Sequence, residues 1–336
     1  MKKFLKIFGG IVLALLLLIG AGLIYFVSSY PKSEPAADIK IELTAERIKR
    51  GEYLANYVMP CFYCHASPDY NYYSGPLAPG TKGKGGTKIE HEGFGKLYMP
   101  NLTPAALGNW TDGEIIRAIT AGINKDGKAL FPMMPYTEYR HLPEADVQAI
   151  VAYLRTLPPI PNDVPKSQLD FPLNLIARAF PKPYKPASRP TTSDTVAYGK
   201  YLSKISGCDF CHTQMDGIGD PIPGLEFAGG NETPLEMGIV PVDTMIVRSA
   251  NITPDVDTGI GAWDKAYFIG RFKEYADSTN SRIPVAKDGE NTVMPWTMYA
   301  GMTEEDLGAI YAYLRTVKPV RNEVEKHPKT DIMTQR

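Results

Sequence analysis

The chain has 336 residues, of which 44% are hydrophobic and 22% are charged, so it is long enough for two folded domains and too apolar for a disordered chain. Its 36 basic and 37 acidic residues leave a formal charge of −1, which excludes the strongly basic surface of a nucleic-acid-binding protein. We therefore expect two domains and no nucleic-acid partner.

Residues 1–30 are predicted to form a transmembrane anchor with a short cytoplasmic N-terminus. Three lysines precede a run of 21 uncharged residues from Ile7 to Val27, about the length that a helix needs to cross the hydrocarbon core. Lysines before the run favour a cytoplasmic N-terminus, so the rest of the chain should lie on the periplasmic side of the cytoplasmic (inner) membrane. A cleaved signal peptide is the alternative, although no clear cleavage site of small residues follows.

Two Cys-x-x-Cys-His motifs, at residues 61–65 and 208–212, contain every cysteine in the chain. This spacing is the attachment signature of c-type haem, in which both thiols form thioether bonds to the porphyrin and the histidine becomes an iron ligand. A redox dithiol or half of a zinc site is the alternative, but a zinc ribbon would need the two cysteine pairs closer together. Two covalently bound haems are therefore predicted, attached through these residues: Cys61, Cys64, His65, Cys208, Cys211 and His212.

The two motifs belong to an internal repeat. Between residues 142–164 and 302–324, 12 of 23 positions are identical without a gap. Each copy begins with a Gly-x-Tyr-Leu helix that leads into the haem motif, and it later contains an Asn-[Leu/Ile]-Thr-Pro motif. Each copy ends with an amphipathic helix that has acidic residues in its first turn. We predict a mainly α protein with two tandem cytochrome c-like haem domains, at residues 41–165 and 191–327.

A proline-rich linker over residues 166–190 is predicted between the two domains. Nine prolines between residues 158 and 190 disfavour regular helix. The middle of the linker, residues 171–180, is too apolar for a free tether. We expect it to pack across both domains and to fix their relative orientation.

The sixth iron ligand of each haem distinguishes an electron carrier from a catalytic haem. Methionine is the partner of histidine in electron-transfer cytochromes c, where it raises the reduction potential. Only one candidate in the first copy has a methionine counterpart in the second: Met134 matches Met294, and both precede a proline and an aromatic residue. His65 and Met134 are therefore predicted on one iron, and His212 and Met294 on the other. The rejected candidates are Met59, Met99, Met133, His91 and His141.

A proximal histidine usually donates its second ring N–H to an acceptor. Pro76 and Pro223 both lie 11 residues after their haem histidines, so a proline carbonyl could serve, although ordinary loop prolines are the equal alternative. His91 lies in the glycine-rich stretch 80–95 and is expected to be a solvated loop residue.

These motifs, together with Phe171-Pro172-Leu173-Asn174 in the linker, resemble those of class I cytochrome c domains. More closely, they resemble the multihaem cytochrome c subunits of membrane-bound alcohol and gluconate dehydrogenases. The resemblance implies electron transfer from a dehydrogenase or quinol-side donor to a respiratory acceptor, such as a cytochrome complex or a terminal oxidase. Those subunits carry three haems, whereas this chain has two motifs.

We expect a non-catalytic electron-transfer protein, or the electron-transfer subunit of a dehydrogenase, with no catalytic residue of its own. The alternative is a dihaem peroxidase-like enzyme, which would need one iron with an open or displaceable sixth position. A haem-based sensor would need an output domain, which the sequence does not indicate.

Overall fold

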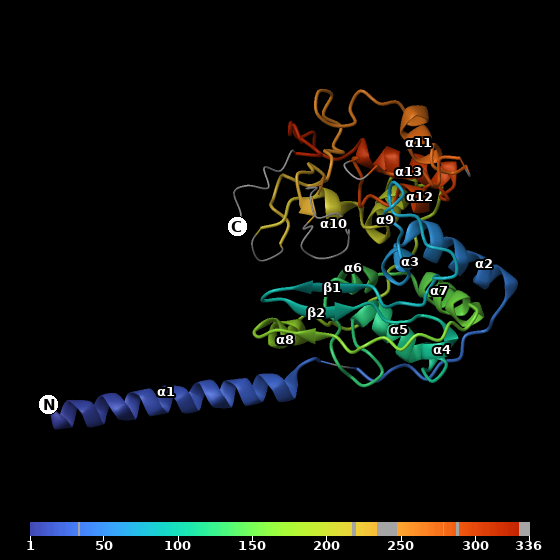
Figure 1. The fold of residues 1–336 in the computed structure, drawn as a ribbon. Helices are drawn as coiled ribbons and strands as arrows, with labels where there is room; N and C mark the ends of the chain where they lie inside the picture. The colour runs from blue at the N-terminus through green and yellow to red at the C-terminus, as the bar shows by residue number, and fades with distance from the viewer. Residues whose placement is uncertain (33, 217–219, 234–246, 278, 287–288, 329–336) are drawn as a thin grey trace.

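The computed structural model describes residues 1–32, 34–216, 220–233, 247–277, 279–286 and 289–328 (Figure 1). It is partly helical, with two small sheets and long loops between the helices. One long helix at the N-terminus extends away from a body that contains the rest of the described chain (Figure 1).

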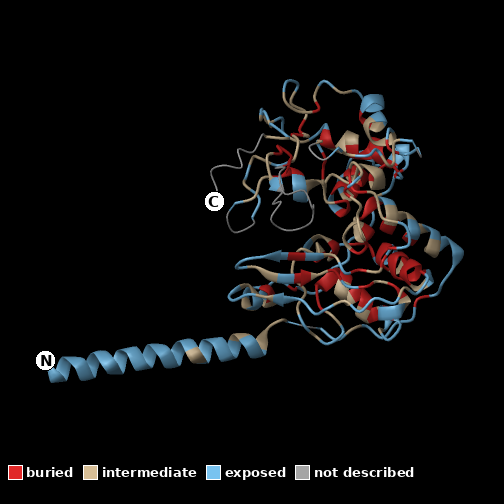
Figure 2. Cartoon of the chain, in the orientation of Figure 1, coloured by how far each residue is buried: buried red, intermediate tan, exposed pale blue. Residues whose placement is uncertain are grey.

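Helix α1 (Lys2–Ser29) is exposed along its length and packs against none of the core (Figure 2). Its mean hydropathy is 2.8, and none of the apolar window is buried, so its length and composition suit a helix that crosses a membrane. A signal sequence near an N-terminus has the same properties. Within the described chain, no other element covers the apolar surface of α1. The hydrocarbon core of a bilayer would cover such a surface.

The first half of the body, residues 41–165, is held together by a crossing of its first and last helices. Helix α2 packs on α7, and a Cβ on Gly51 would overlap the carbonyl oxygen of Ala149, so only glycine lets the two backbones approach this closely. The elements of this half are α2 (Ala45–Tyr53), the π-helix η1 (Leu54–Val58), α3 (Cys61–Cys64), β1 (Lys88–His91), β2 (Gly95–Tyr98), α4 (Pro104–Leu107), α5 (Asp112–Ala121), α6 (Tyr136–Tyr139) and α7 (Glu144–Thr156).

The second half, residues 191–327, repeats this arrangement. Helix α9 packs on α13. A Cβ on Gly199 would overlap the carbonyl oxygen of Ala309, just as a Cβ on Gly51 would overlap that of Ala149. The apolar stripe that was predicted for each last helix faces the core: Val147 and Leu307, for example, are fully buried. The elements of this half are α9 (Thr195–Ile205), α10 (Cys208–His212), β4 (Glu232–Thr233), β5 (Val247–Arg248), α11 (Lys265–Lys273), α12 (Trp296–Tyr299) and α13 (Glu304–Leu314).

The small sheets were not predicted from the sequence. Strands β1, β2 and β3 (Gln168–Leu169) form one antiparallel sheet, so the linker pairs with the first half. His91, expected in a loop, is the exposed last residue of β1. The glycine-rich composition of this stretch hid a four-residue strand in which only Ile89 is buried.

The prediction that residues 171–180 pack across both halves is wrong. This segment contains α8 (Leu173–Ile176) and the 3-10 helix η2 (Ala177–Ala179), and only Ala177 within it is buried. Its aromatic ends Phe171 and Phe180 are 75% and 38% exposed. Its apolar character therefore does not serve contact between the halves.

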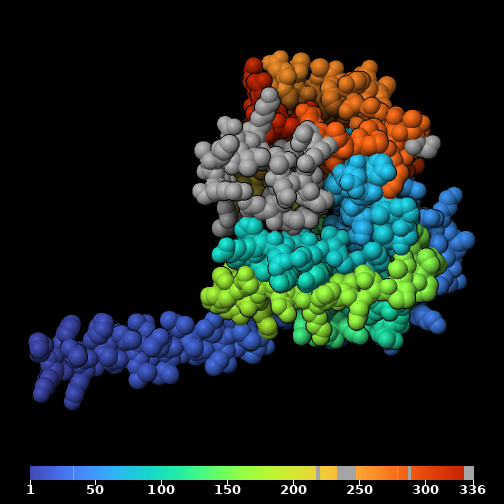
Figure 3. Space-filling model, viewed as in Figure 1, coloured from blue at the N-terminus to red at the C-terminus, as the bar shows by residue number. Residues whose placement is uncertain are grey.

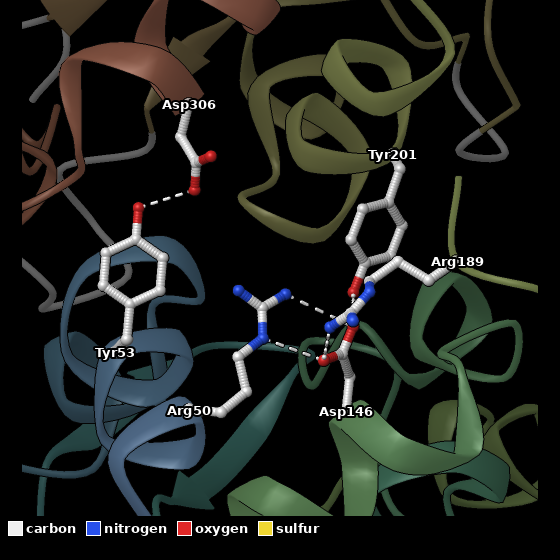
Figure 4. Close-up of polar contacts among 6 residues, drawn as sticks. All are labelled: Arg50, Tyr53, Asp146, Arg189, Tyr201 and Asp306. Carbon is white, nitrogen blue, oxygen red and sulfur yellow. Dashed lines mark hydrogen bonds and ion pairs between the residues drawn. The ribbon is translucent and has the colours of Figure 1, made fainter. Parts of the chain in front are cut away.

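Two tyrosine–carboxylate contacts join the halves instead, and they are related by the repeat (Figure 4). Tyr53 from α2 donates to Asp306 Oδ2 at the start of α13, and Tyr201 from α9 donates to Asp146 Oδ2 at the start of α7, both at 2.6 Å. The acidic first turns predicted for the last helices thus also bind the opposite half.

The two carboxylates differ in the number of positively charged side chains that pair with them (Figure 4). Asp146 has no exposed surface, and it also receives Arg50 Nε at 2.9 Å and Arg189 Nη1 at 3.1 Å. The repeat places Tyr198 where the first half has Arg50, and among the described residues no arginine or lysine pairs with Asp306. Within the described part of the chain, Tyr53 is therefore the one side-chain donor to the carboxylate of Asp306.

Candidate functional site

The two Cys-x-x-Cys-His motifs form short helices, α3 after the π-helix η1 in the first half and α10 after α9 in the second. All four thiols are free, with no disulfide between them. Burial raises the pKa of both Cys61 and Cys208 to about 12, whereas a redox dithiol needs a lowered thiol pKa. Among the described residues there is also no cluster of three or more His, Cys, Asp or Glu that could hold a zinc ion.

The histidine of each motif is buried and oriented by one hydrogen bond. His65 Nδ1 lies 2.8 Å from Pro100 O, and His212 Nδ1 lies 2.7 Å from Ala250 O. Because a carbonyl oxygen can only accept, each Nδ1 carries the proton and each Nε2 keeps its lone pair for a metal. Burial also lowers the pKa of both imidazoles, which favours the neutral form that binds iron.

These acceptors differ from the ones suggested by the sequence, which were Pro76 and Pro223. The carbonyls belong to the residues that immediately precede the two Asn-[Leu/Ile]-Thr-Pro motifs. The repetition of that motif is visible in the sequence, but the acceptor lies 35 residues after the histidine in the first half and 38 after it in the second.

The Asn-[Leu/Ile]-Thr-Pro motif holds the acceptor loop in place. In the first half, Asn101 Oδ1 accepts from the backbone N and the hydroxyl of Thr103, and Asn101 Nδ2 donates to Ile160 O at 2.8 Å. In the second half, Asn251, Thr253 and Val320 O repeat these bonds. All four motif side chains are buried, so each motif ties the acceptor loop to the chain just after the last helix.

Met134 and Met294 occupy matching positions in the two halves. Each is half-buried, lies one residue before the proline that starts a short helix (α6 or α12), and accepts from the backbone N two residues later, at 2.7 and 2.8 Å. Both pack against one core cluster, which also contacts Cys61 and Cys208. The two methionine loops are therefore alike in backbone structure as well as in sequence.

The rejected ligand candidates lie elsewhere. Met99 and Met133 belong to a separate small cluster with Cys64, and Met59 is buried in the main core. His141 is exposed, and its Nδ1 contacts Lys185 O at 3.1 Å. Met99 and Met133 thus lie in a cluster that also contacts the haem-motif residue Cys64.

The set of donors fits a c-type haem. Each half supplies two free thiols at the attachment spacing, a buried neutral imidazole with its Nε2 available, and a thioether on a loop stiffened by proline. A harder metal would need several carboxylate or carbonyl ligands, and the described residues hold no group of three or more His, Cys, Asp or Glu side chains.

The first half also holds the methionine loop of the second half. Tyr63, inside the first haem motif, donates to Val293 O at 2.9 Å, and Ser74 Oγ donates to Met294 O at 2.7 Å. The second half has Phe210 at the position of Tyr63, and its side chain is 53% exposed. The sequence did not indicate this contact, because it joins positions more than 200 residues apart.

Comparison with known proteins agrees with this site, although no protein-family model matches the chain. The chain is 29% identical over 290 residues to the cytochrome c subunit of a quinone-type alcohol dehydrogenase from Gluconacetobacter polyoxogenes, covering 81% of this chain and 56% of that subunit. It is 26% identical over 282 residues to the gluconate 2-dehydrogenase cytochrome c subunit of Pantoea cypripedii, covering 80% and 59%.

A third relative is a diheme c-type cytochrome from Cereibacter sphaeroides. The chain is 29% identical to it over 268 residues, which cover 74% of this chain and 87% of that protein. The chain thus spans little more than half the length of the dehydrogenase subunits but most of the diheme protein. The chain is a relative of the cytochrome c subunits of alcohol and gluconate dehydrogenases and of a diheme c-type cytochrome.

Proposed function

We propose that the chain is a dihaem c-type cytochrome that transfers electrons, with one haem domain at residues 41–165 and a second at residues 191–327. The observation that carries the proposal is the repeated donor set. In both halves a haem-motif histidine donates its Nδ1–H to a carbonyl, and a methionine lies on a matching loop before a short helix. Each bound haem iron would supply one-electron redox chemistry.

The residues of the chain attach, ligate and shield the two groups. Cys61 and Cys64 bind one haem covalently, and Cys208 and Cys211 bind the other. The proposed axial pairs are His65 with Met134 and His212 with Met294. A thioether ligand favours Fe(II), so both sites should have the raised potentials of electron carriers. No residue of the chain then needs to act as an acid, a base or a nucleophile.

The proposed partners are redox proteins. Two of the relatives described above are cytochrome c subunits of dehydrogenases, which supports a dehydrogenase or quinol-side electron donor. The proposed acceptor is a respiratory cytochrome complex or a terminal oxidase. A body without excess positive charge is compatible with docking to basic surfaces of such partners.

A redox titration of the purified full chain, combined with EPR, tests this function. Intact mass should show two covalent haems, the oxidised protein should be fully low-spin, and reduction should take up two electrons per chain. A stable high-spin fraction at neutral pH, with peroxide turnover that requires reduction of one haem, would instead support the peroxidase-like alternative.

We also propose that α1 is an uncleaved, single-pass anchor in the cytoplasmic membrane, with both haem domains on the periplasmic side. Its exposed apolar surface and its three N-terminal lysines support this topology. The native protein should begin at or near Met1 and should remain in the membrane fraction through a high-salt wash. A native N-terminus close to Ser28 would show that the segment is a removed signal peptide.

A further inference from the structure

Residues 171–180, called here the α8 segment, expose apolar side chains that the body does not cover. Phe171, Ile176 and Phe180 are 75%, 46% and 38% exposed. Exposed apolar groups gathered on a short stretch of chain indicate an interaction surface rather than a free linker.

The α8 segment is bonded directly to the end of α1. Arg178 Nη2 donates to Val27 O at 2.7 Å, and its Nε donates to Tyr30 O at 3.0 Å. These are carbonyls from the last turn of a helix and from the residue that follows it, which lack partners within the helix and attract a positive charge. The α8 segment therefore lies beside the point where α1 ends, as Figures 1 and 3 show.

The end of α1 has the composition of a membrane interface. Phe26 stacks on Tyr30 with ring centroids 5.0 Å apart, and Lys32 Nζ lies 5.6 Å from the centroid of the Tyr30 ring. Aromatic and basic residues at the end of an apolar span mark the headgroup level of a bilayer. Any group that is hydrogen bonded to Val27 and Tyr30 must lie at nearly the same level.

We propose that the α8 segment docks on the bilayer surface, with Phe171, Ile176 and Phe180 inserted at the boundary between headgroups and acyl chains. The proposal rests on α1 being the membrane anchor of the proposed function. Lys182 and Lys185, exposed just beyond the segment, would lie against anionic headgroups. The anchor and this second attachment together hold the haem-bearing body in one orientation relative to the membrane.

The position of labelled side chains in a bilayer tests the proposal. The full chain is placed in phosphatidylcholine–phosphatidylglycerol vesicles after a single cysteine carrying an environment-sensitive fluorophore is introduced. The four native cysteines are bound to haem in the holoprotein, so the new thiol is the only reactive one. Three variants are compared: Phe171→Cys in the segment, Leu16→Cys in α1, and Val256→Cys, which is 67% exposed in the second half.

The Phe171→Cys label should emit at shorter wavelength than the Val256→Cys label and should be quenched several-fold more by a nitroxide near the headgroups. A nitroxide deep in the acyl chains should quench the Leu16→Cys label most. If Phe171→Cys matches Val256→Cys while Leu16→Cys is quenched, the docking proposal is overturned and the anchor stands. If Leu16→Cys is also unquenched, both the anchor and the docking fail, while the two-electron titration still tests the redox function.

Discussion

Replacing Tyr53 with phenylalanine should destabilise the protein more than the same replacement at Tyr201, although the repeat makes the two residues equivalent. Both hydroxyls donate at 2.6 Å to a buried carboxylate of the opposite half. Asp146 would keep two arginines after the loss of Tyr201, whereas Asp306 would keep no cation among the described residues. The Tyr53 hydroxyl also accepts from the backbone N of Thr303 at 3.1 Å.

The expected losses in the free energy of unfolding follow from the cost of leaving a buried polar group without its hydrogen-bond partner. Tyr201→Phe removes one hydrogen bond from a carboxylate that stays paired, so the free energy of unfolding should fall by about 1–1.5 kcal/mol. Tyr53→Phe leaves a carboxylate that is only 7% exposed without its donor, which raises the cost to about 2–3 kcal/mol. Both substitutions retain the ring and therefore most of the packing.

Urea unfolding of the full chain in detergent, followed by circular dichroism and by tryptophan fluorescence, measures both values. The midpoint should fall further for Tyr53→Phe, with an unchanged slope if the same surface is exposed. Equal losses for the two variants, or a larger loss for Tyr201→Phe, would refute the reasoning that Asp306 depends on its tyrosine alone.

Three further variants and one control variant test the repeat and the site. Gly199→Ala should lower the melting temperature strongly, because its Cβ would overlap a carbonyl of the crossing helix α13, whereas Gly270→Ala in α11 has open space and should be neutral or stabilising. Asn251→Ala should loosen the loop that accepts from the haem histidine and shift the EPR g-values of one haem only. Tyr63→Phe should perturb the absorption band of the haem for which Met294 is the proposed ligand, although Tyr63 lies in the first haem motif; an unchanged band would show that the bond to the opposite loop has no effect.

The local elements could be predicted because their signals are short-range. The Gly-x-Tyr-Leu helices, the haem motifs and the last helices each follow from patterns within a few residues, and the structure has helices there. The repeat then equated Met134 with Met294, and the structure shows the same backbone hydrogen bond at both.

The contacts between the halves could not be predicted, because they depend on pairs far apart in the chain. Asp146 and Asp306 fit the acidic first turn of a helix, and nothing local shows that each also receives a tyrosine from the opposite half. The apolar α8 segment was expected to pack across both halves, but hydrophobicity alone does not distinguish a buried contact from an exposed apolar surface.

The absorption spectra of three methionine variants test the central claim, the matching histidine–methionine ligation of both irons, most directly. Met134→Ala and Met294→Ala should each lose part of the weak far-red band of Fe(III)–Met bonds while both haems stay covalently attached. Met99→Ala should keep the whole band. If Met99→Ala removes half of the band and Met134→Ala leaves it intact, the first haem has a different ligand and the account of two equivalent electron-transfer sites is wrong.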